Sequence, residues 1–207
     1  MLRAIPNYDE RFNLTRAVSR QKTVLLRLHI TPEANRDRLG EYWSRGLWSM
    51  DSKTILESLM RVKGDSWLNV ALLLPSLPSA LIYSYPQMEE ATNAVSKDCH
   101  WTSFNFFHFP PDNNFSTPSY AVGKLDSDYY PINSDPRFGD IVLFLTPQNK
   151  GVHSAVFIAD NIVFTKNGVG DVNPWMLDTI ENLIDLYSFS LPEGQPIKVY
   201  YFRHKNR

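Results

Sequence analysis

Cysteine is almost absent from this sequence. Cys99 is the single cysteine among 207 residues, so the chain can form no internal disulfide bond. A lone thiol is compatible with an intracellular or an extracellular location. Most free cysteines are small buried side chains and not nucleophiles. The residues around Cys99 and downstream of it therefore decide which interpretation is preferred.

Long hydrophobic runs are also missing. The most apolar run covers residues 68–74 and ends at Pro75, which is much too short to span a bilayer. Residues 1–10 lack the apolar core of a secretory signal peptide. We therefore expect no transmembrane segment, and a cytoplasmic location unless the chain is a processed form.

Neither sign of charge is in excess. The chain has 21 Lys and Arg residues against 22 Asp and Glu residues, with a net charge of −1. A nucleic-acid partner or an anionic membrane surface would require a basic excess, so neither is expected. Asp126, Asp128 and Asp135 do not have the spacing of a calcium loop, so we predict no metal site and no cofactor.

The first half of the chain predicts a mainly helical N-terminal extension over residues 1–85. Its periodicity and its turn residues indicate one strand and three helices, over 23–30, 31–44, 51–63 and 66–74. We find no chemical motif in this half. Residues 86–207 then form a second domain, and the length of the chain is sufficient for one domain with such an extension.

The second half contains the lone cysteine in a suggestive position. Asp98 is a favourable N-cap residue, which would place Cys99 in the first turn of a helix. A helix N-terminus carries about half a positive charge, which favours thiolate over thiol. The spacing of Phe106 and Phe107 would anchor this segment in the core.

A group of strands follows. The region 108–130 reads as a loop, and a helix is predicted to open at Asn173 and Pro174. Branched and aromatic residues predict four strands, over 140–145, 152–159, 162–166 and 196–202. His153 lies near the start of the second strand. A lone cysteine with a distant histidine on a strand is typical of a thiolate–imidazolium pair.

The turn after the second strand decides which residue faces His153. A two-residue loop at 160–161 places Lys166 on the face of His153, whereas a three-residue loop with a bulge sets Asn167 directly across from it. The side-chain carbonyl of Asn167 can accept a hydrogen bond from the imidazole and fix its tautomer. We therefore prefer Asn167 as the third residue.

The order of these motifs resembles a known superfamily. A helix beginning with Asp98-Cys99 is followed by strands that carry 139–142, Gly-Asp-Ile-Val, and 153–160, His-Ser-Ala-Val-Phe-Ile-Ala-Asp. Over about residues 86–203 the chain resembles the NlpC-type papain-like superfamily of bacterial cell-wall peptidases and amidases. The resemblance implies an α+β fold in which a central antiparallel sheet packs on the helix that carries the cysteine.

The resemblance also implies roles for residues. Cys99 would be the nucleophile, His153 the general base and then the acid, and Asn167 the orienting residue, with Thr165 and Lys166 near enough in register to compete. Asn93 lies where these enzymes keep an amide donor to the oxyanion hole. The substrate would be a peptide, an amide or an ester, with a cell-wall peptide as one example.

Two residues depart from the family pattern. His100 and Trp101 follow the cysteine where those peptidases have small residues, and they narrow the space beside the thiol. His100 is a rival base because it adjoins Cys99, but consecutive helical residues do not face each other.

The sequence therefore predicts a cysteine hydrolase that forms an acyl-enzyme. Two alternatives remain open. A catalytically silent papain-like binding module would be favoured by a cleft that Trp101 blocks, or by a cysteine and a histidine too far apart for contact. A thiol acyltransferase on the same fold would be favoured by an apolar, elongated cleft.

Overall fold

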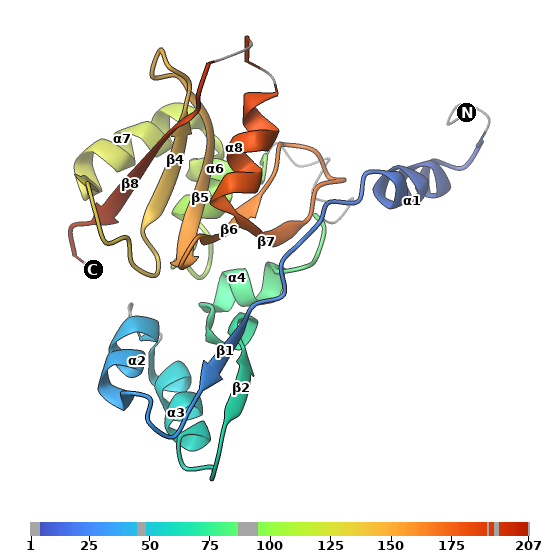
Figure 1. Ribbon diagram of the computed structural model, residues 1–207. Helices are drawn as coiled ribbons and strands as arrows, with labels where there is room; N and C mark the ends of the chain where they lie inside the picture. Colours follow the sequence, from blue (N-terminus) through green and yellow to red (C-terminus); the bar gives the residue numbers. More distant parts are fainter. Residues whose placement is uncertain (1–4, 45–48, 87–94, 190, 193–194, 207) are drawn as a thin grey trace.

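A six-stranded antiparallel sheet forms the centre of the molecule (Figure 1). The computed structural model describes residues 5–44, 49–86, 95–189, 191–192 and 195–206. The strands are β3 (Tyr129–Ile132), β4 (Ile141–Leu145), β5 (Gly151–Ala159), β6 (Ile162–Lys166), β7 (Trp175–Thr179) and β8 (Lys198–His204). Their order is β3-β8-β4-β5-β6-β7, and every neighbouring pair is antiparallel. The four strands predicted in the second half of the chain are confirmed, and the protein belongs to the α+β class.

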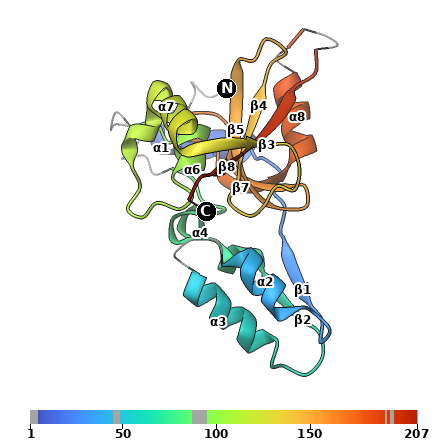
Figure 2. The same cartoon turned by 90° about the vertical axis from the view of Figure 1, so that its left-hand side faces the viewer.

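Helices cover both faces of this sheet. Helix α8 (Ile180–Ser188) packs on one face, and α6 (Cys99–Phe104) and α7 (Pro118–Asp128) lie on the other, as Figure 2 shows. On the α8 face, Leu183 packs with Phe144 and Phe157 in one hydrophobic cluster. Because both faces are covered, strands such as β5 are apolar on both sides and read as nearly continuous hydrophobic runs.

Helix α6 begins where the sequence predicts. The side chain of Asp98 accepts a hydrogen bond from the backbone N–H of Trp101 at 2.9 Å, which is an N-cap. Further along the helix, Thr102 accepts a hydrogen bond from the indole N–H of Trp175 on β7 at 3.0 Å. The cap and this contact hold the start of α6 against the sheet.

The first half of the chain contains strands as well as helices. Its elements are α1 (Tyr8–Val18), β1 (Arg27–Ile30), α2 (Arg36–Trp43), α3 (Ser49–Leu59), β2 (Ser66–Asn69), the 3₁₀ helix η2 (Val70–Leu73) and α4 (Ser76–Leu81). The helix predicted over 66–74 is wrong, because its first four residues pair with β1 in a two-stranded ribbon. In that ribbon Trp67 lies opposite His29 and stacks on its ring with 4.2 Å between centroids.

The two halves of the chain share one hydrophobic core. Trp43 of α2 lies against Phe138, with 5.3 Å between ring centroids, and the hydroxyl of Tyr42 donates to the carbonyl of Ile158 at 2.8 Å. The backbone of Val24 donates to Leu177 on β7 at 3.0 Å. Residues of the N-terminal half therefore complete the core and cover part of the edge of the sheet.

Two further predictions in the second half are wrong. The expected loop over 108–130 contains the 3₁₀ helix η3 (Asn113–Ser116), α7 and the start of β3. The helix predicted from Asn173 begins only at Ile180, because the apolar residues before it pair with β6 as strand β7. Proline at the first helical position is present in α7, at Pro118.

The turn between β5 and β6 combines the two alternatives considered from the sequence. Ala159 pairs with Ile162 across a two-residue loop, and a bulge then shifts the register so that Val156 pairs with Phe164. Continued along both strands, this register sets His153 opposite Asn167 and places Thr165 on the same face as His153. Lys166 is thereby moved to the opposite face.

Candidate active site

The Cys99 thiol lies at the first position of α6, beside the beginning of β5. It is almost completely buried, with 9% of its surface exposed. The backbone N–H and the hydroxyl of Ser154 hydrogen-bond to the sulfur. The pairing of β5 with β6 ends at Val156 and Phe164. The sulfur therefore accepts a hydrogen bond from the backbone N–H of Ser154, which lies beyond the last paired residues of the two strands.

Burial controls the protonation of this thiol. Desolvation raises the pKa of Cys99 to about 11, with a further contribution from the carboxylate of Asp98, while hydrogen bonds from Ser154 and from the backbone of His100 lower it. The lowering expected from a helix N-terminus is therefore outweighed, and α6 is only six residues long. The thiol is protonated at neutral pH.

His153 is fully buried on the α8 side of the sheet. Its ring stacks on Tyr187 of α8 at 4.4 Å and lies 5.6 Å from the ring of Phe144. Burial, followed by the nearby charge of His100, lowers the pKa of His153 to about 3. The imidazole is therefore neutral at physiological pH.

The two ring nitrogens of His153 have different surroundings. Nε2 lies 2.6 Å from the hydroxyl oxygen of Thr165 on β6, and both residues are fully buried. Nδ1 has no hydrogen-bond partner within the part of the chain that the structure describes. When Nε2–H donates to Thr165, Nδ1 carries the free lone pair of a buried base.

Cys99 and His153 meet at one end of β5 without a hydrogen bond between them. His153 and Ser154 are consecutive, so their side chains point to opposite faces of the sheet, and Cys99 binds Ser154. The cysteine nevertheless lies close to the histidine cluster. Tyr187 stacks on the ring of His153. Burial raises the pKa of Tyr187 most, and the charge of a Cys99 thiolate raises it further.

Asn167 lies opposite His153 in the register of the two strands, but Thr165 makes the hydrogen bond to His153 that the sequence assigned to Asn167. The amide of Asn167 donates to Gln21 at 3.2 Å, and its Oδ1 is buried without a partner among the described residues. Lys166 lies on the other face, where its ammonium donates to the carbonyls of Gly168 and Gly170 at 3.1 Å each. Of the three candidates for the third residue, Thr165 is the one with a hydrogen bond to His153.

Ser154 is the residue that sequence reasoning missed. Its hydroxyl lies 3.0 Å from Nδ1 of His100, and it also contacts Cys99. His100 cannot face Cys99 directly, but Ser154 bridges the two. Strand alternation predicts that Ser154 and His153 point to opposite faces of the sheet, but it does not say which of the two faces the helix that carries the cysteine. Asn93 lies outside the described residues.

An apolar groove opens beside this cluster. Its volume is about 310 Å³, and its lining comes from α6, α7, β4 and the start of β5: His100, Phe104, Pro118, Ala121, Val122, Leu125, Leu143, Leu145, Asn149, Gly151 and His153. Trp101 is not part of this lining. It is 1% exposed and its indole donates to Asn113 at 3.1 Å, so it is turned into the core and leaves the groove open.

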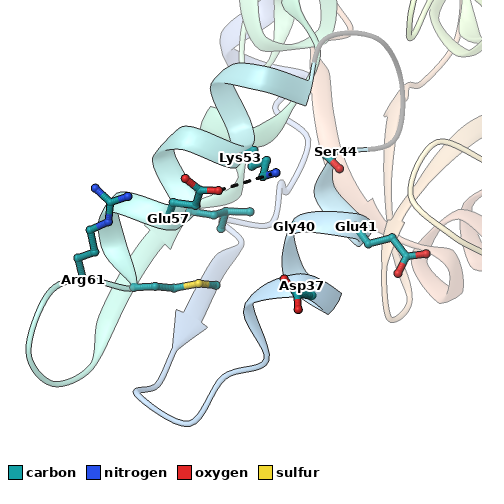
Figure 3. Close-up of a pocket in the computed structure, with 9 residues that line it drawn as sticks. Asp37, Gly40, Glu41, Ser44, Lys53, Glu57 and Arg61 are labelled. Carbon is teal, nitrogen blue, oxygen red and sulfur yellow. Dashed lines mark ion pairs between the residues drawn. The ribbon is translucent and has the colours of Figure 1, made fainter.

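A second cavity lies between α2 and α3 in the N-terminal half (Figure 3). It has a volume of about 520 Å³, and charged side chains surround it, including the ion pair of Lys53 and Glu57 at 3.9 Å. It contains neither of the site histidines. Over the described ranges, no group of three or more histidine, cysteine or acidic side chains is arranged to hold a metal ion.

Comparisons with known protein families, with curated proteins and with solved structures give no significant match. Over the same described ranges, no helix is both long and apolar enough to cross a membrane.

Proposed function

We propose that this protein is a cysteine hydrolase with a papain-like arrangement, which cleaves an amide or an ester through an acyl-enzyme. The observation that carries the proposal is Nδ1 of His153, which is buried and has no hydrogen-bond partner among the described residues. A buried polar atom without a partner costs about 1–3 kcal/mol, so native proteins rarely keep one without a role. This nitrogen lies at the end of β5 against which Cys99, the single cysteine of the chain, packs.

The proposed reaction begins with a proton transfer. The Cys99 thiol gives its proton to Nδ1 of His153 when the two side chains come into contact, and Thr165 holds the imidazole by Nε2 during this step. Sulfur then bonds to the carbonyl carbon of the substrate. The backbone N–H of Cys99 at the helix start would donate to the oxyanion, and such a donor is worth roughly 3 kcal/mol.

The second half of the reaction restores the enzyme. The bond from the carbonyl carbon to the leaving group breaks, and His153 delivers its proton to the departing amine or alcohol. Water then attacks the thioester, releases the acid and returns a proton to Cys99. In the resting structure the proton stays on sulfur, so the proposal requires substrate binding to bring Sγ and Nδ1 together.

The test is to trap the acyl-enzyme. Wild-type protein incubated with p-nitrophenyl acetate should release nitrophenolate and gain the mass of one acetyl group on Cys99. Cys99→Ala should show neither, and His153→Ala should be slowed by roughly 10²–10⁴-fold, the usual contribution of a general base. His29→Gln, a histidine in the β1–β2 ribbon, serves as the matched control and should keep full activity. Acylation that survives in His153→Ala would remove His153 from the mechanism.

A silent binding module is the second candidate. The absence of a hydrogen bond between Cys99 and His153, together with the raised pKa of the thiol, favours it. It predicts no turnover of any ester or amide, and iodoacetamide alkylation of Cys99 with an inflection above that of a free thiol in the wild type and in His153→Ala alike.

A thiol acyltransferase is the third candidate, and the apolar groove favours it. Adding an alcohol or a primary amine to the reaction distinguishes transfer from hydrolysis. Transfer would yield the new ester or amide in place of the free acid.

A further inference from the structure

The groove beside the site has the chemistry of an aliphatic binding surface. Leucines of β4 and small or apolar residues of α7 form its floor and one wall, namely Leu143, Leu145, Pro118, Ala121, Val122 and Leu125. Its lining, as far as the described residues form it, contains no lysine, arginine, aspartate or glutamate. By contrast, charged side chains line the cavity between α2 and α3.

The groove runs from His100, the residue after Cys99, to the β4–β5 turn, and Cys99 itself is not among its lining residues. Leu143 pairs directly with Ser154, which hydrogen-bonds to Cys99, and Leu145 pairs with Gly151 near the turn. The floor of the groove therefore starts at Leu143, whose cross-strand partner Ser154 contacts Cys99. His100 lines the groove and is hydrogen-bonded to Ser154, so the polar end of the groove and the cysteine share that hydroxyl.

We infer that the groove holds the linear acyl chain of the substrate, with the carbonyl carbon placed at Cys99. The inference rests on the proposed function and names its substrate class as medium-chain acyl esters or amides, as opposed to cell-wall peptides. At the roughly 30 Å³ that a water-sized group occupies, a groove of about 310 Å³ accommodates about ten carbons. A peptide would leave its backbone N–H and carbonyl groups facing leucines, which is costly.

The proposed step is balanced without an additional reagent. The Sγ–acyl bond forms as the acyl–oxygen bond of the ester breaks. The thiol proton travels through His153 to the alkoxide, and water later converts the thioester to a fatty acid while it restores the thiol. The apolar groove contributes only binding, so its effect is to favour longer chains.

The experiment is a series of p-nitrophenyl esters from acetate to myristate. We expect kcat/KM to rise by up to about fourfold for each methylene that the groove buries, up to about ten carbons, and then to level off. Val122→Glu places a charge on the rim of the groove at a residue that is already 57% exposed. It should remove the rise of kcat/KM with chain length. Val62→Glu, at a valine 54% exposed near α3, is the matched control and should behave as wild type.

Direct binding separates the two proposals. The affinity of the Cys99→Ala variant for decanoate, measured by calorimetry, should fall at least tenfold when Val122→Glu is added. Turnover of acetate without any chain-length dependence would overturn the acyl-groove inference and leave the hydrolase standing. Binding of decanoate with no turnover of any ester would reject the hydrolase and leave the acyl groove standing. Neither binding nor turnover would reject both.

Discussion

Acidification should destabilise this protein through His153 in particular. Burial lowers its pKa from 6.5 to about 3 in the folded protein, whereas the unfolded chain keeps the ordinary value. Between these two values the unfolded state binds the extra proton. The stabilising contribution of the neutral ring is therefore complete above pH 6.5 and is lost as the pH falls toward 3.

The magnitude follows from the size of this shift. Each pKa unit corresponds to about 1.4 kcal/mol, so the whole window is worth up to about 5 kcal/mol for a ring that is fully buried. The free energy of unfolding should fall by about 1.4 kcal/mol per pH unit below pH 6 from this residue alone. The whole window is a large share of the free energy of unfolding of a typical domain.

The assay is urea unfolding at several pH values between 7.5 and 4.5. His153→Phe keeps an aromatic ring between Phe144 and Tyr187 but cannot be protonated. The difference in unfolding free energy between wild type and this variant isolates the histidine, since the other groups titrate alike in both. Parallel curves for the two proteins would refute the assignment of a buried, neutral His153.

Three further predictions concern stability. Thr165→Val removes the hydroxyl that holds Nε2 of the site histidine and should cost about 1–3 kcal/mol in urea unfolding, whereas Thr165→Ser should recover most of the loss. Arg203→Met leaves the buried carboxylate of Asp140 without its two-point guanidinium partner, at 3.0 and 2.7 Å, and should cost about 3–5 kcal/mol; a loss below 1 kcal/mol would contradict this. Gly139→Ala should lower the melting temperature, because φ is +88° and an added methyl group would overlap a phenylalanine ring, while Gly123→Ala, on an open helix face, should raise it slightly.

Strands and the start of the cysteine helix were predictable from the sequence because their signals are local. Apolar runs defined β4, β5 and β6, and the cap by Asp98 is a contact over three residues. Segment β2 was missed because its strand character depends on pairing with β1, almost forty residues earlier. Strand β7 (Trp175–Thr179) was missed for the same reason, since its strand character depends on pairing with β6.

The site was predictable in its residues more than in its contacts. Cys99 and His153 do lie at one end of β5. The hydrogen-bond partner of the histidine, however, depended on a bulge at Ile158, which no residue type predicts. The protonation states depended on burial, which emerges only when both faces of the sheet are covered. The Gly-Asp pair at 139–140 illustrates a motif with a structural reason, because Gly139 takes a positive φ and Asp140 binds Arg203.

The strand order has a consequence for how the chain is made. Strand β8 lies between β3 and β4, although it follows both in the sequence by more than fifty residues. During synthesis β4, β5, β6 and β7 can pair in turn as neighbouring hairpins, but the slot beside β4 stays empty until β8 leaves the ribosome. Until then β4 presents an open, apolar edge of the kind that recruits other chains. The nascent protein is therefore most exposed to misassembly just before its last strand arrives.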